Sequence, residues 1–165
     1  MIYLSKVEIR VSTIEDGALF KRVLLQPGVL EYFPMYDLRE VEDAVRIWEI
    51  FCRKGASLTA VKDNIPCGIA FLNLQGYKKL THQCLITIAL DEAFRNQGIG
   101  TKLLEKLIFI SKDSFNLEMI HLEVYETNPA RRLYQRLGFT EFGMHPNFIK
   151  EDGRYINKIF MQLSL

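Results

Sequence analysis

The chain has 165 residues, a length that fits one domain with a sizeable hydrophobic core. With 48% hydrophobic and 25% charged residues, its composition is typical of a globular protein in water. The net charge of +1 excludes a protein that attracts nucleic acid through a strong overall field. No apolar run approaches the roughly 20 residues needed to cross a bilayer. We therefore expect neither a nucleic-acid nor a membrane partner.

The three cysteines, Cys52, Cys67 and Cys84, have neither CxxC spacing nor the even count of a disulfide framework. Free thiols in a reducing compartment are the simplest interpretation. The N-terminal residues carry no basic end followed by an apolar stretch and a cleavage site. We therefore expect a cytoplasmic protein.

The N-terminal segment predicts a strand followed by a short helix. Alternating apolar residues indicate a strand over Tyr3–Val11. Thr13 and Asp16 have the spacing of a capping box, which favours a helix start. This helix must end by Pro27–Gly28.

A longer helix and two strands follow. The helix begins after the capping residue Asp37 and continues to Gly55, with apolar residues at helical spacing. Two strands, Ser57–Lys62 and Cys67–Leu74, are predicted next. They are joined at Asp63–Asn64, a turn-forming pair.

The C-terminal half alternates strands and helices. The nearly continuous apolar segment Cys84–Leu90 is typical of a central strand buried on both faces. A helix over Gly98–Lys112 and a strand over Met119–Tyr125 follow. A compact helix is predicted over Pro129–Leu137. The chain then ends in two strands joined at Asp152–Gly153, a strong hairpin signal.

The predicted order is strand, two helices, three strands, helix, strand, helix and hairpin. Such an order forms a mixed sheet with helices on its faces, a mixed α/β (α+β) fold. No repeat, low-complexity tract or linker divides the chain. Residues 1–165 are therefore predicted to form a single domain.

A glycine-containing segment, Arg95–Thr101, lies between the buried strand and the following helix. Gly98 and Gly100 allow a tight turn, and the helix start adds unpaired N–H donors and the positive end of a dipole. This combination favours binding of a phosphate or pyrophosphate. Alternatively, the glycines only turn the chain. The segment lacks the Lys-Ser/Thr ending of a P-loop and the third glycine of the dinucleotide fingerprint.

Two motifs in this order resemble those of a known family. The pattern Arg95-x-x-Gly98-x-Gly100 after ITIALDEAF is similar to the acyl-CoA signature of the GNAT superfamily, the general-control-related N-acetyltransferases. The segment NPARRLYQRLGF, Asn128–Phe139, is similar to the second signature of that family, at the expected distance. The element order also agrees, so the resemblance covers essentially the whole chain. It implies a GNAT-like three-layer fold, with a mixed central β-sheet flanked by about four helices.

The resemblance also implies a role for each matching position in binding acetyl-CoA. Backbone amides of Gln97–Thr101 would hold the pyrophosphate, and the backbone of Ile88–Leu90 would pair with the pantetheine arm. Asn128 would contact this arm, but it lies one residue closer to Tyr134 than is common in the family, so Thr127 is the alternative. The implied binding residues are Ile88, Ala89, Leu90, Arg95, Asn96, Gln97, Gly98, Ile99, Gly100, Thr101 and Asn128.

Tyr134 is the candidate catalytic acid. On the predicted helix it shares a face with Ala130, Leu133 and Leu137, so it points inward. By spacing alone it is an aromatic core residue with a locally satisfied hydroxyl. The resemblance instead places it near the thioester sulfur, where its hydroxyl would protonate the departing thiolate.

Glu123 is the candidate catalytic base. It lies on the polar face of the predicted strand, and some related amino-terminal acetyltransferases have a similar LEV sequence there. A base is useful because the reference pKa is about 8 for an α-amino group and about 10.4 for lysine. The alternative is a solvated carboxylate or an ion pair with a neighbouring Lys or Arg. The lesser candidates at strand ends, which we expect to be solvated, are Asp91, Glu92 and Glu126.

No metal is expected, because His82, His121 and His145 lack ligand spacing and clustered partners. The resemblance implies that the loop between the first two helices borders the amine-binding cleft. Its apolar residues are Val29, Leu30, Tyr32, Phe33, Met35 and Tyr36. Glu31 and Asp37 could attract a cationic amine. Ordinary packing of the loop over the core is the alternative.

These observations predict an enzyme, an acetyl-CoA-dependent N-acetyltransferase in which the amine attacks the thioester directly. The acceptor would be a small-molecule or peptide amine, namely a protein N-terminus, a lysine, an amino acid or a polyamine. The protein would be a monomer or homodimer. A catalytically silent acyl-CoA-binding or sensing module is the alternative, and a nucleotide-binding protein that uses the glycine segment for another phosphate is a third.

Overall fold

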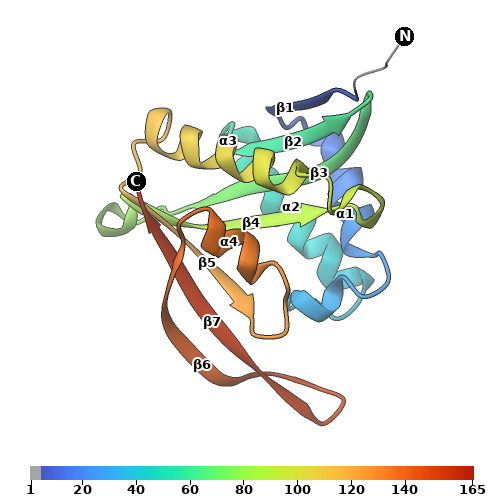
Figure 1. The fold of residues 1–165 in the computed structure, drawn as a ribbon, viewed down its shortest axis with the longest axis vertical. Coiled ribbons are helices and arrows are strands. Elements are labelled where there is room, and N and C mark those ends of the chain that lie inside the picture. The colour runs from blue at the N-terminus through green and yellow to red at the C-terminus, as the bar shows by residue number, and fades with distance from the viewer. Residues whose placement is uncertain (1–4) are drawn as a thin grey trace.

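The computed structural model describes residues 5–165, which form a seven-stranded mixed sheet with helices on both faces (Figure 1). The strand order is β1-β2-β3-β4-β5-β7-β6, and β4 and β5 are the parallel pair in an otherwise antiparallel sheet. The strands are β1 (Val7–Val11), β2 (Ser57–Lys62), β3 (Ile65–Leu74), β4 (Gln83–Leu90), β5 (Met119–Tyr125), β6 (Thr140–Glu151) and β7 (Arg154–Ser164). The α-helices are α1 (Gly17–Leu24), α2 (Leu38–Arg53), α3 (Ile99–Asp113) and α4 (Arg131–Arg136). The predicted fold class is confirmed.

Two hydrophobic cores lie on opposite faces of the sheet. On β3, Ile69 and Phe71 pack against α1 and α2, whereas Ala70 and Leu72 pack against α3. This period of two is the alternation of side chains along a strand. Trp48 of α2 is completely buried in the first of these cores, as its helical spacing predicts.

The predicted capping signals start the first two helices. Thr13 N–H donates to Asp16 Oδ2 at 2.8 Å, and a short 3₁₀ turn, Ile14–Asp16, leads into α1. Asp37 Oδ1 accepts from Glu40 N–H at 3.0 Å at the start of α2. In each case a side chain satisfies a backbone donor that would otherwise have no partner.

Two strands begin at positions that differ from the prediction. β1 starts at Val7, and residues 3 and 4 of the predicted strand lie outside the described residues. β3 starts at Ile65, two residues early, although Pro66 argues against a strand. Pro66 is accommodated because it lies opposite Val61, where the pairing of β2 and β3 shifts register.

The helix α4 is shorter than predicted. It begins at Arg131 rather than at Pro129, because Asn128 Oδ1 accepts from Ala130 N–H at 2.9 Å and holds a turn there. Gly138 follows the helix with φ +97°, so it stops the helix as predicted.

Both predicted turn pairs connect adjacent strands. Asp63 and Asn64 have φ angles of 48° and 68°, and Asp152 and Gly153 have φ angles of 49° and 75°. Two consecutive positive φ angles are typical of the tightest hairpin turns. The second turn closes the long hairpin of β6 and β7, which extends away from the other elements (Figure 1).

The three cysteines are free, as predicted. Cys52, Cys67 and Cys84 are also buried. Burial raises the pKa of the Cys84 thiol to about 12, so this side chain serves packing rather than reactivity. Within residues 5–165, none of the helices has the length and apolar character needed to cross a membrane.

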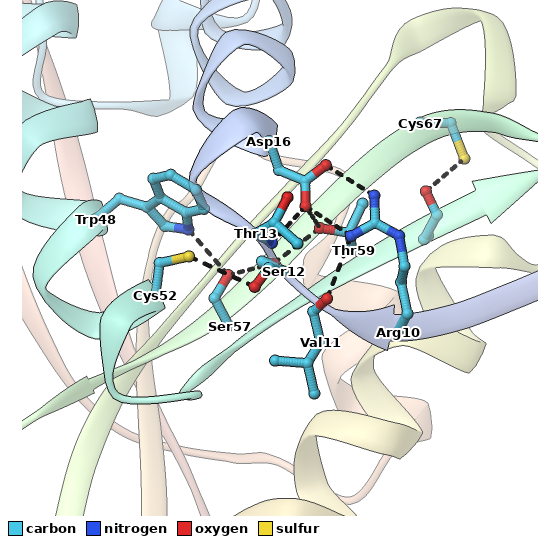
Figure 2. A network of polar contacts seen from close by, with 11 residues as sticks. Arg10, Val11, Ser12, Thr13, Asp16, Trp48, Cys52, Ser57, Thr59 and Cys67 are labelled. Atoms are coloured by element: carbon cyan, nitrogen blue, oxygen red, sulfur yellow. Dashed lines mark hydrogen bonds and ion pairs between the residues drawn. The ribbon is translucent and has the colours of Figure 1, made fainter.

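A buried polar network fixes the start of α1 to the sheet (Figure 2). The guanidinium of Arg10 donates to both carboxylate oxygens of Asp16, at 2.7 and 2.9 Å. Thr59 Oγ1 donates to Asp16 at 3.0 Å, and Trp48 Nε1 donates to Ser57 Oγ at 2.9 Å. The network therefore joins β1, β2, α1 and α2.

The Asp16 carboxyl is only 5% exposed, yet it stays ionised. Burial alone would raise its pKa. Hydrogen bonds from Arg10, Thr13 N–H and Thr59 outweigh the burial and hold the pKa of Asp16 below its usual range. Its contribution to stability is therefore present above the unfolded pKa of about 3.9 and is lost as the pH falls through the folded pKa.

We expect Asp16→Asn to lower the free energy of unfolding at pH 7 by about 1–3 kcal/mol, because it removes a buried, charge-assisted interaction. Urea denaturation between pH 3 and pH 7 measures this effect. The difference between variant and wild type should begin to shrink as the pH falls below the unfolded pKa of about 3.9, because Asp16 of the unfolded chain then takes up a proton. Asp43→Asn is the matched control, since Asp43 pairs with Arg46 on an exposed helix surface. An equal loss in both variants would contradict the role of the network.

Candidate active site

The candidate site lies where β4 and β5 separate. The two strands pair only between Gln83–Leu85 and Met119–His121. Farther along, β4 stays paired with β3 as far as Leu90. Over Ile86–Leu90, the edge of β4 that faces β5 therefore has no strand partner within the described chain. Backbone groups on such an edge can pair with an extended ligand.

This separation corrects the prediction that Cys84–Leu90 is buried on both faces. Only Cys84, Ile86 and Ala89 of this segment are buried, and the other side chains are half-buried. Leu85 lies in the part of β4 that pairs with β5, whereas Thr87, Ile88 and Leu90 lie beyond it. The second half of the apolar segment therefore borders an edge of β4 that has no strand partner among the described residues.

The predicted phosphate-binding segment forms the start of α3. Gly98 precedes the helix with φ +76°, in the left-handed region. The first helical hydrogen bond runs from Lys102 N–H to Gly98 C=O at 3.2 Å. The N–H groups of Ile99, Gly100 and Thr101 precede it and have no acceptor within residues 5–165. These donors, at the positive end of a 15-residue helix, form a site for an anion.

Gly100 contributes differently from Gly98, because its φ is not positive. A methyl group placed on Gly100 would lie 3.5 Å from Leu133 Cδ2 and 4.0 Å from Leu90 Cδ2. The start of α3, the helix α4 and the end of β4 therefore converge at this glycine. Left-handed backbone occurs in this segment at Gly98 and at Asn96, which has φ +59°.

Two side chains of the segment fold back on the protein. Arg95 Nε donates to Leu90 C=O at 3.3 Å. Gln97 donates to Ala93 C=O at 3.3 Å and accepts a hydrogen bond from Lys62. These contacts fix the loop, so that its backbone rather than these side chains is available to a ligand.

Asp91 is buried, which corrects the expectation that it is solvated. Its carboxylate accepts from Arg22 at 2.5 Å and from Gln26 and Ala93 N–H at 3.0 Å each. Gln26 also accepts from Glu92 N–H at 3.1 Å. Burial alone would raise the pKa of Asp91, but these hydrogen bonds outweigh it and hold the pKa below its usual range. The cluster ties the end of α1 to the segment just before the glycines.

Tyr134 points into the core, as its position on the helix predicts. It is 7% exposed, and its ring packs edge-on against Phe139 with the centroids 6.1 Å apart. Its hydroxyl has no hydrogen-bond partner within the described chain. Burial raises the pKa of Tyr134 to about 12, so the hydroxyl keeps its proton at neutral pH. Asn128, whose Oδ1 holds the turn before α4, lies on the loop that joins β5 to this helix.

Glu123 lies on the polar face of β5, as predicted, with 39% of its side chain exposed. Its Oε2 accepts from Lys158 Nζ of β7 at 2.9 Å. An ion pair was one of the two interpretations, although the sequence carried no signal for Lys158 as the partner. Glu92 and Glu126, the other candidates at strand ends, are exposed, as expected.

The histidines do not form a metal site. His121 contacts Gln83 through Nε2 and Oε1 at 2.6 Å, across the paired part of β4 and β5. Burial lowers the pKa of His121, so the ring is neutral at neutral pH. No group of three potential metal ligands occurs within residues 5–165.

The loop between α1 and α2 mainly covers the core. Val29 is buried, and Leu30, Phe33 and Met35 pack against the same core as α1 and α2. These contacts support the interpretation of ordinary packing for these residues. Tyr36 is 77% exposed and is the aromatic residue of this loop that a ligand could reach most easily.

The sequence of this protein is similar to those of known acetyltransferases. A family model described as the acetyltransferase (GNAT) family matches residues 24–139, which include both sequence motifs. An N-alpha-acetyltransferase from Sulfurisphaera tokodaii is 31% identical over 80% of this chain and 77% of its own length. Another, from Sulfolobus acidocaldarius, is 32% identical over 81% of this chain and 80% of its own.

Solved structures share the fold. A ribosomal-protein-alanine N-acetyltransferase from Brucella melitensis has a TM-score of 0.82 and 22% identity, covering 96% of this chain and 99% of that one. A Salmonella typhimurium protein assigned to the acetyltransferases, solved with its cofactor acetyl-CoA, has a TM-score of 0.81 and 21% identity, covering 96% of this chain and 93% of that one.

These matches decide among the predicted functions. Acetyl transfer from acetyl-CoA to an amine is confirmed, and nothing in the matches favours a silent sensing module. The family model covers more than half of the sequence, and the two relatives align over most of their own length. The chain belongs to the acetyltransferase (GNAT) family.

Proposed function

We propose that residues 1–165 form a single N-acetyltransferase domain that acetylates the α-amino group of a peptide or protein N-terminus. The observation that carries the proposal is the open edge of β4 beside the unpaired N–H groups of α3. A protonated hydroxyl on α4 and a carboxylate on β5 belong to the elements that border this opening. The names of the two archaeal relatives and of the Brucella structure support an α-amino acceptor.

The donor side of the site would hold acetyl-CoA through its backbone. We assign the N–H groups of Gln97–Thr101 to the pyrophosphate and the free edge of Ile88–Leu90 to the pantetheine arm. Asn128 would donate to the same arm through Nδ2, since its Oδ1 is occupied by Ala130 N–H. A methyl group placed on Gly98 would meet no atom of a residue beyond its chain neighbours within 4 Å, so the surroundings of this glycine are open.

Acetyl-CoA supplies a thioester whose sulfur leaves as a thiolate. Tyr134 is the proposed acid, because its pKa of about 12 keeps the hydroxyl protonated throughout the neutral range. The hydroxyl also has no hydrogen-bond partner in residues 5–165 that would compete with the sulfur. The ring packs edge-on against Phe139 in the core.

Glu123 is the proposed base for the amine. Its carboxylate is partly exposed, and Oε1 has no hydrogen-bond partner within residues 5–165, whereas Oε2 is bound to Lys158. At pH 7, about one in ten α-amino groups of pKa near 8 is already uncharged, against fewer than about one in a thousand lysine side chains. A single exposed carboxylate is therefore a sufficient base for an α-amine, and this favours the α-amino acceptor.

A panel of acceptors tests the proposed substrate class. It contains a lysine-free peptide with N-terminal alanine, an N-blocked peptide with one lysine, free alanine and spermidine. Release of the CoA thiol should be fastest with the first peptide, with kcat/KM at least about tenfold above the other acceptors. Faster turnover of spermidine or of the lysine peptide would overturn the assignment.

Gly98→Ala should weaken acetyl-CoA binding at least about tenfold, because the left-handed backbone that aims the N–H groups becomes strained. Isothermal titration calorimetry measures the dissociation constant. Gly153→Ala is the matched control, since Gly153 has φ +75° with equally open surroundings at the tip of the hairpin. Unchanged affinity in the Gly98 variant would remove this loop from the binding site.

Tyr134→Phe keeps the packing against Phe139 and removes the proton. We expect kcat to fall about 100-fold, within the usual range for a lost general acid, with KM for acetyl-CoA nearly unchanged. Steady-state kinetics with the alanine peptide distinguishes the two parameters. Full activity would assign Tyr134 to the core alone.

A further inference from the structure

Lys158 is a charged residue that is almost completely buried. It lies on β7, paired with Tyr125 of β5 and with His145 of β6. Only 8% of its side chain is exposed. A buried ammonium group is costly unless it has compensating contacts, so the partners of Lys158 show what holds it in place.

The partners are one carboxylate and two aromatic rings. Lys158 Nζ lies 2.9 Å from Glu123 Oε2. It also lies 3.4 Å from the centroid of the Phe148 ring and 5.2 Å from that of Phe160. Both distances are within the range of cation–π attraction. The ammonium is thus fixed by β6 and β7 as well as by the residue that it contacts on β5.

Two titratable side chains on the same face of β5 as Glu123 carry no charge at neutral pH. Burial lowers the pKa of His121 and raises that of Tyr125 to about 12, and both belong to the same face of β5. His145 stacks against Phe148, with the ring centroids 5.0 Å apart. Among the described residues, Lys158 is the cation that forms an ion pair with Glu123.

We propose that Lys158 is a positioning residue for acetyl transfer, which fixes the Glu123 carboxylate through Oε2 and leaves Oε1 to accept the proton of the amine. The inference rests on the proposed role of Glu123. Lys158 is itself held by its contact with Phe148. Its ammonium group therefore keeps the Glu123 carboxylate in one orientation before the acceptor binds. Preorganisation of this kind lowers the cost of reaching the reactive geometry.

The experiment compares Lys158→Met with Glu123→Gln and with the double variant, using acetyl-CoA and the alanine peptide between pH 7 and pH 10. Methionine keeps an unbranched chain over Phe148 and removes the charge. Lys150→Met is the matched control, because Lys150 also lies over an aromatic ring of the hairpin, Tyr155, at 5.4 Å. Lys158→Arg, which keeps the charge, tests for rescue.

We expect Lys158→Met to lower kcat at pH 7 about tenfold or more, with KM for acetyl-CoA unchanged. The loss should shrink toward pH 10, where solution supplies the free amine and a well-placed base matters less. Lys158→Arg should recover most of the activity, and Lys150→Met should match wild type. Because Lys158 acts through Glu123, the double variant should be no slower than Glu123→Gln alone.

The outcomes separate the two proposals. If Glu123→Gln is as fast as wild type at pH 7, the base is not Glu123 and both proposals fail. If Glu123→Gln is slow but Lys158→Met is not, only the positioning role is overturned. Equal additional slowing by Lys158→Met in both backgrounds, at every pH, also overturns it, since the lysine then supports packing. Should Lys158→Met unfold in a thermal melt, Lys158→Gln takes its place in the same comparison.

Discussion

Only three residue pairs hold β4 and β5 parallel, and the separation that follows determines where the functional groups lie. Each strand keeps its other neighbour, β3 for β4 and β7 for β5, so the sheet divides without losing its outer pairings. The helix α3 starts beyond the end of β4 and leads back to β5, the usual connection between parallel strands. Both strands therefore direct their carboxyl ends to one opening, the usual place for a ligand beside parallel strands.

The helix α1 is held in relation to this opening at both ends. With eight residues it is too short to be stable by itself, so its position depends on contacts with the rest of the protein. The pair Arg10 and Asp16 fixes its start to the sheet, whereas Arg22 and Gln26 bind Asp91 at its end. Because Asp91 directly precedes the loop that leads into α3, the same helix supports the backbone that we assign to the donor.

The two proposed catalytic groups occupy opposite environments. Tyr134 is buried and stays protonated, whereas Glu123 is partly exposed and paired with a cation. Groups that must give and take protons at one pH need environments that separate their protonation states. Here the difference arises because α4 packs into the core while the polar face of β5 is left partly open.

Local patterns in the sequence determine much of this protein. Caps at Thr13 and Asp37, the turn at Asp152–Gly153 and the apolar periodicities predict the elements and their order, because each depends on neighbours within a few residues. The two family motifs are also local patterns, and they identify both the family and the glycine segment. The sequence also predicts the face of Tyr134 on α4 and that of Glu123 on β5.

Three features were decided by the tertiary structure alone. They are the burial of Asp91, the ion-pair partner of Glu123 and the unpaired edge of β4 over Ile86–Leu90. Arg22 and Asp91 are 69 positions apart in the chain, and Glu123 and Lys158 are 35 positions apart. No local periodicity encodes contacts over such distances, since they arise only when the strands have adopted their order and register. A charged residue in a strand is expected to be solvated until its neighbours in the sheet are known. For that reason Lys158 could be recognised as the buried partner of Glu123 only in the folded protein.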